Sequence, residues 1–289
     1  MIGIDWGTSG LRAYRIDAGG AVAEARSAER GILTVAAGTF SQVLEEHVAG
    51  WDDELVLMSG MVGSRQGWRE APYVNCPAGE AEVRKNIVPV EAAGRRSVLI
   101  VPGLSCIDSS GVPDVMRGEE TQILGALDEL PHAATVCLPG THSKWARVRD
   151  GRIESFATFF TGELFAVLCR HSLLGRMMEE GAPSDEAAFA EGVERSGEAS
   201  GLLHHLFGVR TRTLFSELSP RASPSYLSGL LIGHELRSAA ADEVFLLGAP
   251  ALAERYARAA LYLGLAAKTL DPHAAARGLY RLGRSLNRT

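Results

Sequence analysis

Apolar and polar residues alternate along two segments of the chain that begin in the same way. DWGTSGLRAYRIDAGGAV lies near the N-terminus, and LPGTHSKWARVRDGRI lies near the middle of the chain. Laid over each other, they align Gly7 with Gly140 and Thr8 with Thr141. Each predicts a strand, a tight Gly-Thr turn, an alternating strand, a glycine turn and a third strand. The chain therefore contains a duplicated three-stranded unit.

A helical spacing of apolar residues follows each copy, and it predicts helices over residues 39–51 and 162–178. The other apolar patterns predict strands at 55–59, 98–101 and 244–247, and helices at 118–130, 185–194, 202–207, 226–240, 250–263 and 272–282.

These elements predict an α/β protein of two lobes, each with a mixed sheet flanked by helices. Pro131 ends the helix of the first half, so we expect lobes of residues 1–131 and 132–289, with the last helix free to pack on the first lobe. Two similar lobes usually bind their ligand in the cleft between them.

Composition narrows the classes of function. The formal charge is −6 with scattered Lys and Arg residues, which argues against nucleic-acid binding. The four cysteines have no zinc or redox spacing, and no apolar run is long enough for a membrane span. We expect a cytoplasmic protein whose partners include neither nucleic acid nor a membrane.

The first turn carries groups suited to a phosphate and its magnesium. A carboxylate at a strand end precedes small residues whose N–H groups and hydroxyls can approach an anion, and an arginine follows. The alternative is a plain hairpin with a capping aspartate. The candidates are Asp5, which would bind Mg²⁺ through water, and Gly7, Thr8, Ser9 and Arg12 for the phosphate.

The second turn repeats this chemistry and adds a lysine. Its candidates for binding the same polyphosphate are Gly140, Thr141, His142, Ser143 and Lys144, although a lone histidine such as His142 is more often structural. Later, an apolar strand runs into Gly248-Ala249-Pro250, where a flat base could rest against the backbone. The alternative there is an ordinary strand-to-helix connection.

These three segments, in this order, resemble the two phosphate motifs and the adenosine motif of the superfamily that contains sugar kinases, actin and the heat-shock chaperone ATPases. The resemblance covers nearly the whole chain. It implies a ribonuclease-H-like, actin-like ATPase fold in each lobe, with ATP and Mg²⁺ as cofactors.

The stretch LMSGMVGSRQGW resembles the substrate-contacting segment of glycerol and xylulose kinases. The resemblance implies that Arg65 and Gln66 hold the sugar, and Trp68 can cover a small polyol chain. An arginine can also bind a carboxylate bidentately, and Arg69 and Arg117 could share that task. The alternative is a surface loop with a solvated arginine.

The stretch PDVMRGEETQ lies where related sugar kinases carry a catalytic aspartate at a helix start. Here Gly-Glu-Glu replaces the usual Gly-Asp, so the candidate bases are Glu119, then Glu120, then Asp114. At least one of these carboxylates could instead serve only to favour the helix N-terminus electrostatically.

The strings MSGMVGSRQGW, PDVMRGEETQ, LPGTHSKW and TGELFAVL together resemble the 2-dehydro-3-deoxygalactonokinase family. The resemblance implies transfer of the γ-phosphoryl group of ATP to the 6-hydroxyl of the sugar acid 2-dehydro-3-deoxy-D-galactonate, in galactonate catabolism. A homodimer is one expected state of assembly. The alternatives are a kinase for another sugar or sugar acid, and a nucleotide switch of the actin or chaperone type. A Rossmann dehydrogenase is disfavoured, because the first turn lacks Gly-x-Gly-x-x-Gly.

Overall fold

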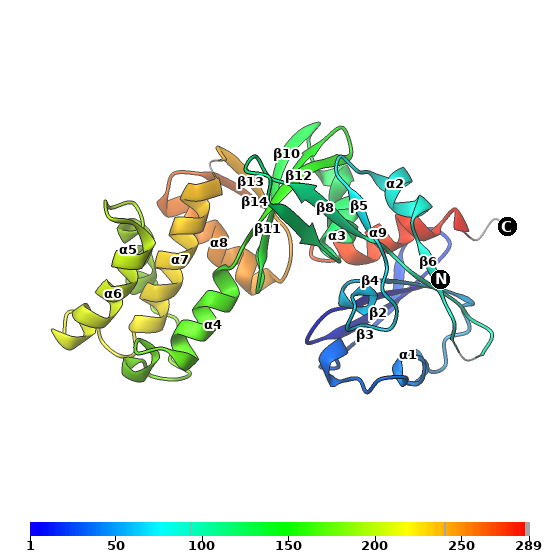
Figure 1. Cartoon of the computed structure of the whole chain (residues 1–289), viewed down its shortest axis with the longest axis horizontal. Coiled ribbons are helices and arrows are strands. Elements are labelled where there is room, and N and C mark those ends of the chain that lie inside the picture. The colour runs from blue at the N-terminus through cyan, green and yellow to red at the C-terminus, as the bar shows by residue number, and fades with distance from the viewer. Residues whose placement is uncertain (93, 240, 287–289) are drawn as a thin grey trace. The chain divides into compact units, whose positions relative to one another are not determined.

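The computed structural model describes residues 1–92, 94–239 and 241–286 (Figure 1). Its strands are β1 Ile2–Trp6, β2 Leu11–Ile16, β3 Val22–Ala28, β4 Leu55–Ser59, β5 Tyr73–Asn75, β6 Val88–Val90, β7 Ser97–Ile100, β8 Gly103–Ile107, β9 Pro113–Met116, β10 Ala133–Leu138, β11 Ser143–Arg149, β12 Arg152–Phe159, β13 Glu243–Leu246 and β14 Ala266–Thr269. Its α-helices are α1 Phe40–His47, α2 Glu80–Lys85, α3 Glu119–Ala126, α4 Thr161–His171, α5 Glu186–Arg195, α6 Gly201–Leu214, α7 Ser223–Ala239, α8 Pro250–Tyr262 and α9 Ala274–Gly283.

The chain divides into two compact units that are discontinuous in sequence. Unit 1 comprises 1–134, 146–157 and 271–289, and unit 2 comprises 135–145 and 158–270. The chain first passes from unit 1 to unit 2 after Ala134, three residues beyond the boundary predicted at Pro131. The division into functional lobes at that residue stays a prediction.

Unit 1 contains a six-stranded mixed sheet in the order β3-β2-β1-β4-β7-β6. Strands β1, β2 and β3 form the predicted antiparallel meander, and β1, β4 and β7 run parallel. Asp5 pairs in register with Ser59 in the parallel strands β1 and β4. The first predicted phosphate turn and the segment after β4 therefore begin at the same end of these two strands.

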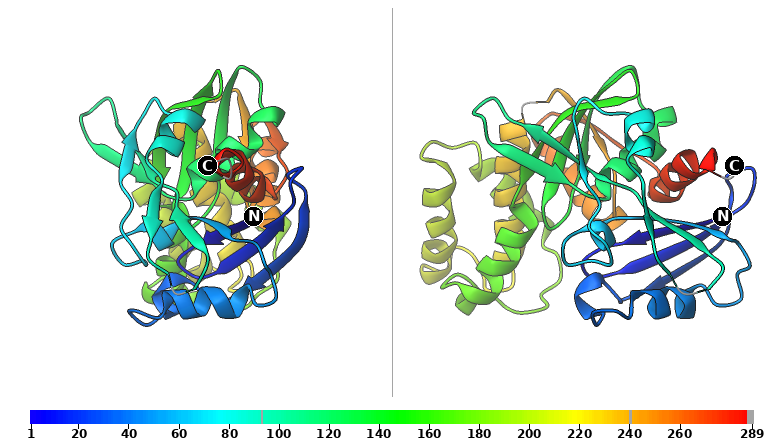
Figure 2. Two further views of the ribbon diagram at one scale, coloured as in Figure 1. Left: turned by 90° about the vertical axis from the view of Figure 1, so that its right-hand side faces the viewer. Right: turned by 45° about the vertical axis from the view of Figure 1, so that its right-hand side comes forward.

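Helices cover both faces of this sheet, α1 on one side and α9 on the other (Figure 2). Phe40, Val43 and Leu44 of α1 share a core with β1 and β4. Helix α9 packs against β1 and β4, and also against α3. The last helix of the chain therefore belongs to unit 1.

A second sheet has the order β12-β11-β10-β13-β14, in which β10, β13 and β14 run parallel. The duplicated meander predicted from the sequence is thus present in both copies. In unit 2, apolar side chains of α5, α7 and α8 form one core with those of β10, β11 and β13. A second core joins α6 to α4 and α7.

A third sheet, β5-β8-β9, was not foreseen. Strands β5 and β9 are short and mostly exposed or half-buried, and β8 has Gly103 and Ser105 among its five residues, so the apolar pattern that identifies a strand is weak in all three. Strand β14 was missed for the same reason, since all four of its residues are exposed. The helix expected at 202–207 extends to Leu214, and the last residue of the helix expected at 226–240 lies outside the described residues.

Within the described part of the chain, no helix combines the length and apolar character that a membrane crossing needs.

Candidate functional site

The first predicted phosphate turn is a tight connection between β1 and β2. The Gly7 N–H donates to the Gly10 carbonyl over 2.9 Å, and the Ile32 N–H donates to the Gly7 carbonyl over 3.0 Å. Gly31 packs directly on the turn, because a Cβ there would lie 1.9 Å from the Thr8 carbonyl oxygen. The side chains of Thr8 and its neighbour Ser9 are exposed. The turn is braced from behind and presents its hydroxyls to solvent.

Asp5 stands at the base of this turn, and its side chain is 17% exposed. Burial raises the pKa of this carboxyl, and the Arg12 guanidinium partly offsets that rise. The shortest distance between the two groups, Arg12 Nη1 to Asp5 Oδ2, is 3.8 Å. A carboxylate with a nearby cation and an opening to solvent can take part in binding a hydrated magnesium ion.

The predicted substrate segment follows β4 and begins at the same end of the strands as the first turn. Gly60 approaches β1 so closely that a Cβ on it would lie 2.8 Å from the Trp6 carbonyl oxygen. Arg65 is 87% exposed and pairs with Glu70 over 2.9 Å. Trp68 is partly buried and stacks on Phe40, with 6.1 Å between ring centroids. Gln66 is exposed.

The three candidate bases have different environments at and before the start of α3. Glu119 is partly exposed, and its Oε2 accepts a 2.9 Å hydrogen bond from the Arg117 N–H. Asp114 lies earlier, on β9, and accepts from the Val115 N–H over 2.7 Å. Glu120 is fully buried, with 0% exposure. In this structure solvent reaches Glu119 but not Glu120.

Glu120 is held entirely by its own helix start. Its Oε2 accepts from the Gly118 N–H over 2.7 Å, and its Oε1 accepts from the Thr121 hydroxyl over 3.0 Å. Burial, with Glu119 beside it, raises the pKa of Glu120 to about 8. Near neutral pH this side chain therefore carries a proton.

The second predicted phosphate turn, residues 139–142, joins β10 to β11 in unit 2. The Thr141 carbonyl accepts from the Glu163 N–H over 2.9 Å, which ties the turn to the first residues of α4. Exposed His142 pairs with Glu163 and stacks on Phe160. A Cβ on Gly162 would lie 2.3 Å from the Gly140 carbonyl oxygen, so the helix start presses directly on the turn.

The Ser143 side chain is directed into unit 2 instead of toward solvent. Its hydroxyl lies 3.0 Å from that of Tyr256, which donates to Glu235 over 2.7 Å. Glu235 also accepts from the indole N–H of Trp145 over 2.7 Å. Burial raises the pKa of Glu235. Lys144 is also mostly buried. Through Ser143, the base of this turn is anchored in a polar network.

Gly248 lies beside the second turn. The Leu247 N–H donates to the Cys137 carbonyl over 2.9 Å, and a Cβ on Gly248 would lie 3.7 Å from the Pro139 carbonyl oxygen. Gly248 has φ 140°, a conformation that side chains disfavour. Helix α8 begins two residues later, at Pro250. The parallel pairing of β10 and β13 therefore brings two of the predicted ATP segments together within unit 2.

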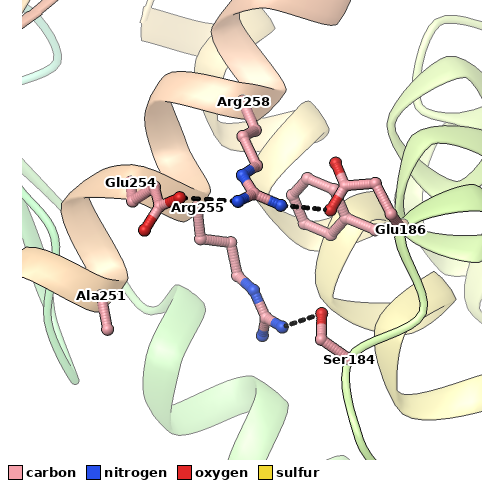
Figure 3. Close-up of a pocket in the computed structure, with 7 residues that line it drawn as sticks. Ser184, Glu186, Ala251, Glu254, Arg255 and Arg258 are labelled. Atoms are coloured by element: carbon pink, nitrogen blue, oxygen red, sulfur yellow. Dashed lines mark hydrogen bonds and ion pairs between the residues drawn. The ribbon is translucent and has the colours of Figure 1, made fainter.

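A pocket of about 190 Å³ opens beside α8 (Figure 3). Arg255 of α8 points across it and donates to the Ser184 hydroxyl over 3.1 Å. Arg258, one turn further along, bridges Glu186 at 2.7 Å and Glu254 at 2.6 Å. The pocket is polar, with a planar guanidinium inside it.

Sequence reasoning missed several of these residues. The spacing of Ala251, Glu254, Arg255 and Arg258 places them on one face of α8, which was a usable signal for a polar helix surface. No local pattern marks Glu235 and Tyr256 as partners, because 21 residues separate them in the sequence.

Comparison with known proteins gives a family. Residues 5–282 match the model of the family described as 2-keto-3-deoxy-galactonokinase. The chain is 40% identical to the Rhizobium meliloti protein named "Probable 2-dehydro-3-deoxygalactonokinase", covering 98% of this chain and 96% of the relative. It is 36% identical to the 2-dehydro-3-deoxygalactonokinase of Escherichia coli, covering 91% and 90% of the two chains.

Solved structures agree with this match. A Sinorhizobium meliloti crystal structure, of "a putative 2-dehydro-3-deoxygalactonokinase protein", is 37% identical with a TM-score of 0.91, covering 100% of this chain and 99% of that one. The activator of 2-hydroxyisocaproyl-CoA dehydratase from Clostridium difficile is 13% identical with a TM-score of 0.54, covering 99% and 96%. That second likeness concerns the fold alone, and it confirms the predicted actin-like ATPase fold.

Proposed function

Because the chain belongs to the 2-keto-3-deoxy-galactonokinase family, we propose that it is an ATP-dependent kinase acting on the 6-hydroxyl of 2-dehydro-3-deoxy-D-galactonate. The products are the 6-phosphate and ADP, and the reaction belongs to galactonate and galactose catabolism. The observation that carries this proposal is the family match over residues 5–282.

Glu119 is the group we propose as the general base. In the reaction the bond between the γ-phosphorus and the β–γ bridging oxygen breaks, and a bond from the 6-oxygen to that phosphorus forms. The hydroxyl proton passes to Glu119, and the bridging electrons leave with ADP. The partial exposure of Glu119 and its anchoring to the Arg117 N–H support this role over Glu120, which is enclosed. General-base help is worth on the order of 10² to 10⁴ in rate.

Each Gly-Thr turn is proposed to bind phosphate groups of ATP. In unit 1 the contacts would be the N–H groups and hydroxyls of residues 7–9 with Arg12, and in unit 2 those of residues 140–143 with Lys144. Phosphoryl transfer depends mainly on positioning and charge neutralisation, which backbone N–H groups and cations supply. Because the Ser143 hydroxyl already bonds with Tyr256, we expect Ser143 to contribute through its backbone.

Magnesium is proposed to bind with the phosphates at Asp5. No group of three or more His, Cys, Asp or Glu residues in the described ranges is placed to hold a metal, so the ion would depend on the nucleotide for most of its ligands. Mg²⁺ commonly binds in this way, through one or two carboxylates, phosphate oxygens and water. The bound ion would neutralise phosphate charge.

The adenosine end of ATP is proposed to extend from Gly248 along α8. The pocket around Arg255 lies on the first turns of the helix that starts after Gly248 (Figure 3). A guanidinium plane can stack on an aromatic base, and the Ser184 hydroxyl can bond with a ring nitrogen. Arg65, Gln66 and Trp68 remain the proposed contacts of the sugar chain, and Arg65 would have to exchange Glu70 for the substrate.

The test is a coupled ADP-release assay with Mg-ATP and a panel of sugar acids and neutral sugars. We expect selective turnover of 2-dehydro-3-deoxy-D-galactonate, its loss with EDTA, and a fall of about 10²-fold or more in kcat for Glu119→Gln, with KM little changed.

Other outcomes of the same assay select the alternatives. Turnover of neutral sugars alone would indicate another sugar kinase. Slow ATP hydrolysis that no acceptor accelerates would contradict the proposal and favour a nucleotide switch.

We also propose a cytoplasmic location and a homodimer. Analytical ultracentrifugation would decide the state of assembly, since a sedimentation coefficient of the 30.8 kDa monomer alone would exclude the dimer at the concentration used.

A further inference from the structure

Unit 1 encloses a group of hydrogen-bonding atoms that have no partner. Six buried side-chain nitrogens and oxygens in the described residues lack one, and four of them belong to Arg117 (Nε and Nη1), Ser59 and Ser64. Burying such groups unsatisfied costs free energy, and natural proteins retain few of them. Four in one region indicate an acceptor that the folded chain itself does not supply.

Backbone contacts bring these residues together. Ser59 ends β4 and precedes Gly60, whose Cα would lie 3.1 Å from a Cβ on Gly118. On the other side of this turn, a Cβ on Gly63 would lie 2.9 Å from Arg117 Nη1. The segment from Ser59 to Ser64 therefore passes over the residues that precede α3.

Two contacts of the guanidinium group, one through Nη2 and one through its flat face, fix the orientation of Arg117. The side chain is buried, with 7% exposure, and Nη2 donates to the Ala71 carbonyl over 2.8 Å. The group also lies over the Tyr73 ring, 4.3 Å from its centroid. These contacts fix the plane of the guanidinium and leave its Nε and Nη1 atoms without partners. Each of these two nitrogens can still donate an N–H to an anionic oxygen such as that of a carboxylate.

We propose that Arg117, with the hydroxyls of Ser59 and Ser64, binds the carboxylate of the sugar acid. This inference rests on the proposed function. The acceptor's carboxylate and its reacting hydroxyl lie at opposite ends of one chain. The guanidinium and the backbone N–H that holds Glu119 lie at opposite ends of the Arg117 residue. One ligand can therefore reach both groups.

Arg117 suits this role better than Arg65 does. Arg65 is exposed and already paired with Glu70, whereas Nε and Nη1 of Arg117 are buried and unpaired, and a charge pair is stronger where water is excluded. Because Nε and Nη1 are enclosed, admitting the carboxylate requires the short turn Met61–Gly63 to move away from them.

The experiment compares 2-dehydro-3-deoxy-D-galactonate with 2-deoxy-D-threo-pentose, the same chain without its carboxylate. For Arg117→Met we expect kcat/KM for the acid to fall about 10- to 150-fold, while kcat/KM for the pentose stays within about twofold. Arg117→Lys keeps the charge but not the two unpaired N–H donors, so its kcat/KM for the acid should lie between those of the wild type and Arg117→Met. In thermal unfolding without ATP, the acid should raise the melting temperature of the wild type but not that of Arg117→Met.

Arg96 offers a matched control for stability. Its side chain is also buried, at 8% exposure, but its nitrogens bond with Glu45, Trp51 and the Asp53 carbonyl. Without ligand, Arg96→Met should lower the melting temperature by on the order of 3 °C or more, and Arg117→Met should leave it unchanged or raise it.

Two results would overturn the inference in distinguishable ways. If Arg117→Met loses acid and pentose turnover equally and is still stabilised by the acid, the carboxylate binds elsewhere and the proposed function stands. If the wild type does not prefer the acid to the pentose, the proposed function fails, and this inference fails with it.

Discussion

At the residue scale, the two glutamates that open α3 differ more than their adjacency suggests. Glu119 is partly exposed, and Glu120 is enclosed with both carboxyl oxygens hydrogen-bonded by its own helix start. From the sequence, the two could be ordered as candidate bases only by their position at the start of the helix. Their burial separates a group that can meet a substrate from a group that shapes the helix N-terminus.

Glu120 makes stability depend on pH. Its pKa is raised from 4.5 to about 8 in the folded protein, so the folded state holds a proton that the unfolded state has released. The free energy of unfolding should therefore fall as pH rises through the window from about 4.5 to about 8, by at most ~1.4 kcal/mol per pH unit. Urea unfolding of the wild type and of Glu120→Gln at pH 5.5, 6.5 and 7.5 would measure this effect.

Glu120→Gln removes the titrating group. The free energy of unfolding of the variant should therefore increase relative to that of the wild type at each higher pH. Stability curves of the two proteins that run parallel across this window would contradict the assignment.

At the element scale, β11 and α8 are joined behind the second phosphate turn. The hydroxyl of Tyr256 bridges Ser143, which follows the turn, and Glu235 of α7. We expect these buried hydrogen bonds to hold the exposed part of the turn in place, since ligand-binding groups need rigid support.

Tyr256→Phe tests this support. Removing the hydroxyl takes one buried hydrogen bond from the Ser143 hydroxyl and one from a Glu235 oxygen, which should lower the free energy of unfolding by ~1–3 kcal/mol. We also expect the KM for ATP to rise more than kcat falls, because the change loosens a binding turn and touches no reacting atom.

Tyr262→Phe is the matched control for unfolding, since Tyr262 lies on the same helix and its hydroxyl bonds with exposed Glu186. Its effect should stay within about 0.5 kcal/mol. Equal losses in the two variants would show that burial of the Tyr256 network contributes nothing.

For the molecule as a whole, helix α9, near the C-terminus, packs against helix α3, which begins with the candidate base Glu119. Helices α3 and α9 meet through glycines: a Cβ on Gly278 would lie 1.9 Å from the Thr121 carbonyl oxygen, and one on Gly125 would lie 1.9 Å from that of Ala274. Arg277 adds a 2.9 Å hydrogen bond to the Gly125 carbonyl. Backbones can approach this closely only where side chains are absent.

Gly278→Ala should therefore separate the two helices. We expect the free energy of unfolding to fall by ~1–3 kcal/mol and kcat to decrease, because the shift reaches the start of α3. Gly208→Ala in α6 is the opposite case, since a Cβ there meets nothing within 4 Å. It should stabilise the protein by up to ~1 kcal/mol. Denaturant unfolding of both variants decides the matter, and a stabilising Gly278→Ala would refute the close packing.

Local sequence patterns were enough to predict the duplicated meander, most helices of unit 2 and the resemblance to sugar kinases. These features rest on local periods and on small residues at turns, which neighbouring residues specify. Strand β4 was placed to the residue at Leu55–Ser59, because a fully buried strand is an unbroken apolar run. The third sheet escaped because its strands are short and partly exposed.

The sequence could not predict which polar side chains are enclosed or which groups they bond with. Ser143 reads as a phosphate hydroxyl in its turn but bonds with Tyr256, 113 residues further along the chain. Arg117 reads as one arginine among several, yet the Ala71 carbonyl, 46 residues away, fixes its guanidinium. Burial and pairing depend on contacts between distant segments, so a local pattern identifies the chemical groups of a site but not the directions in which they point.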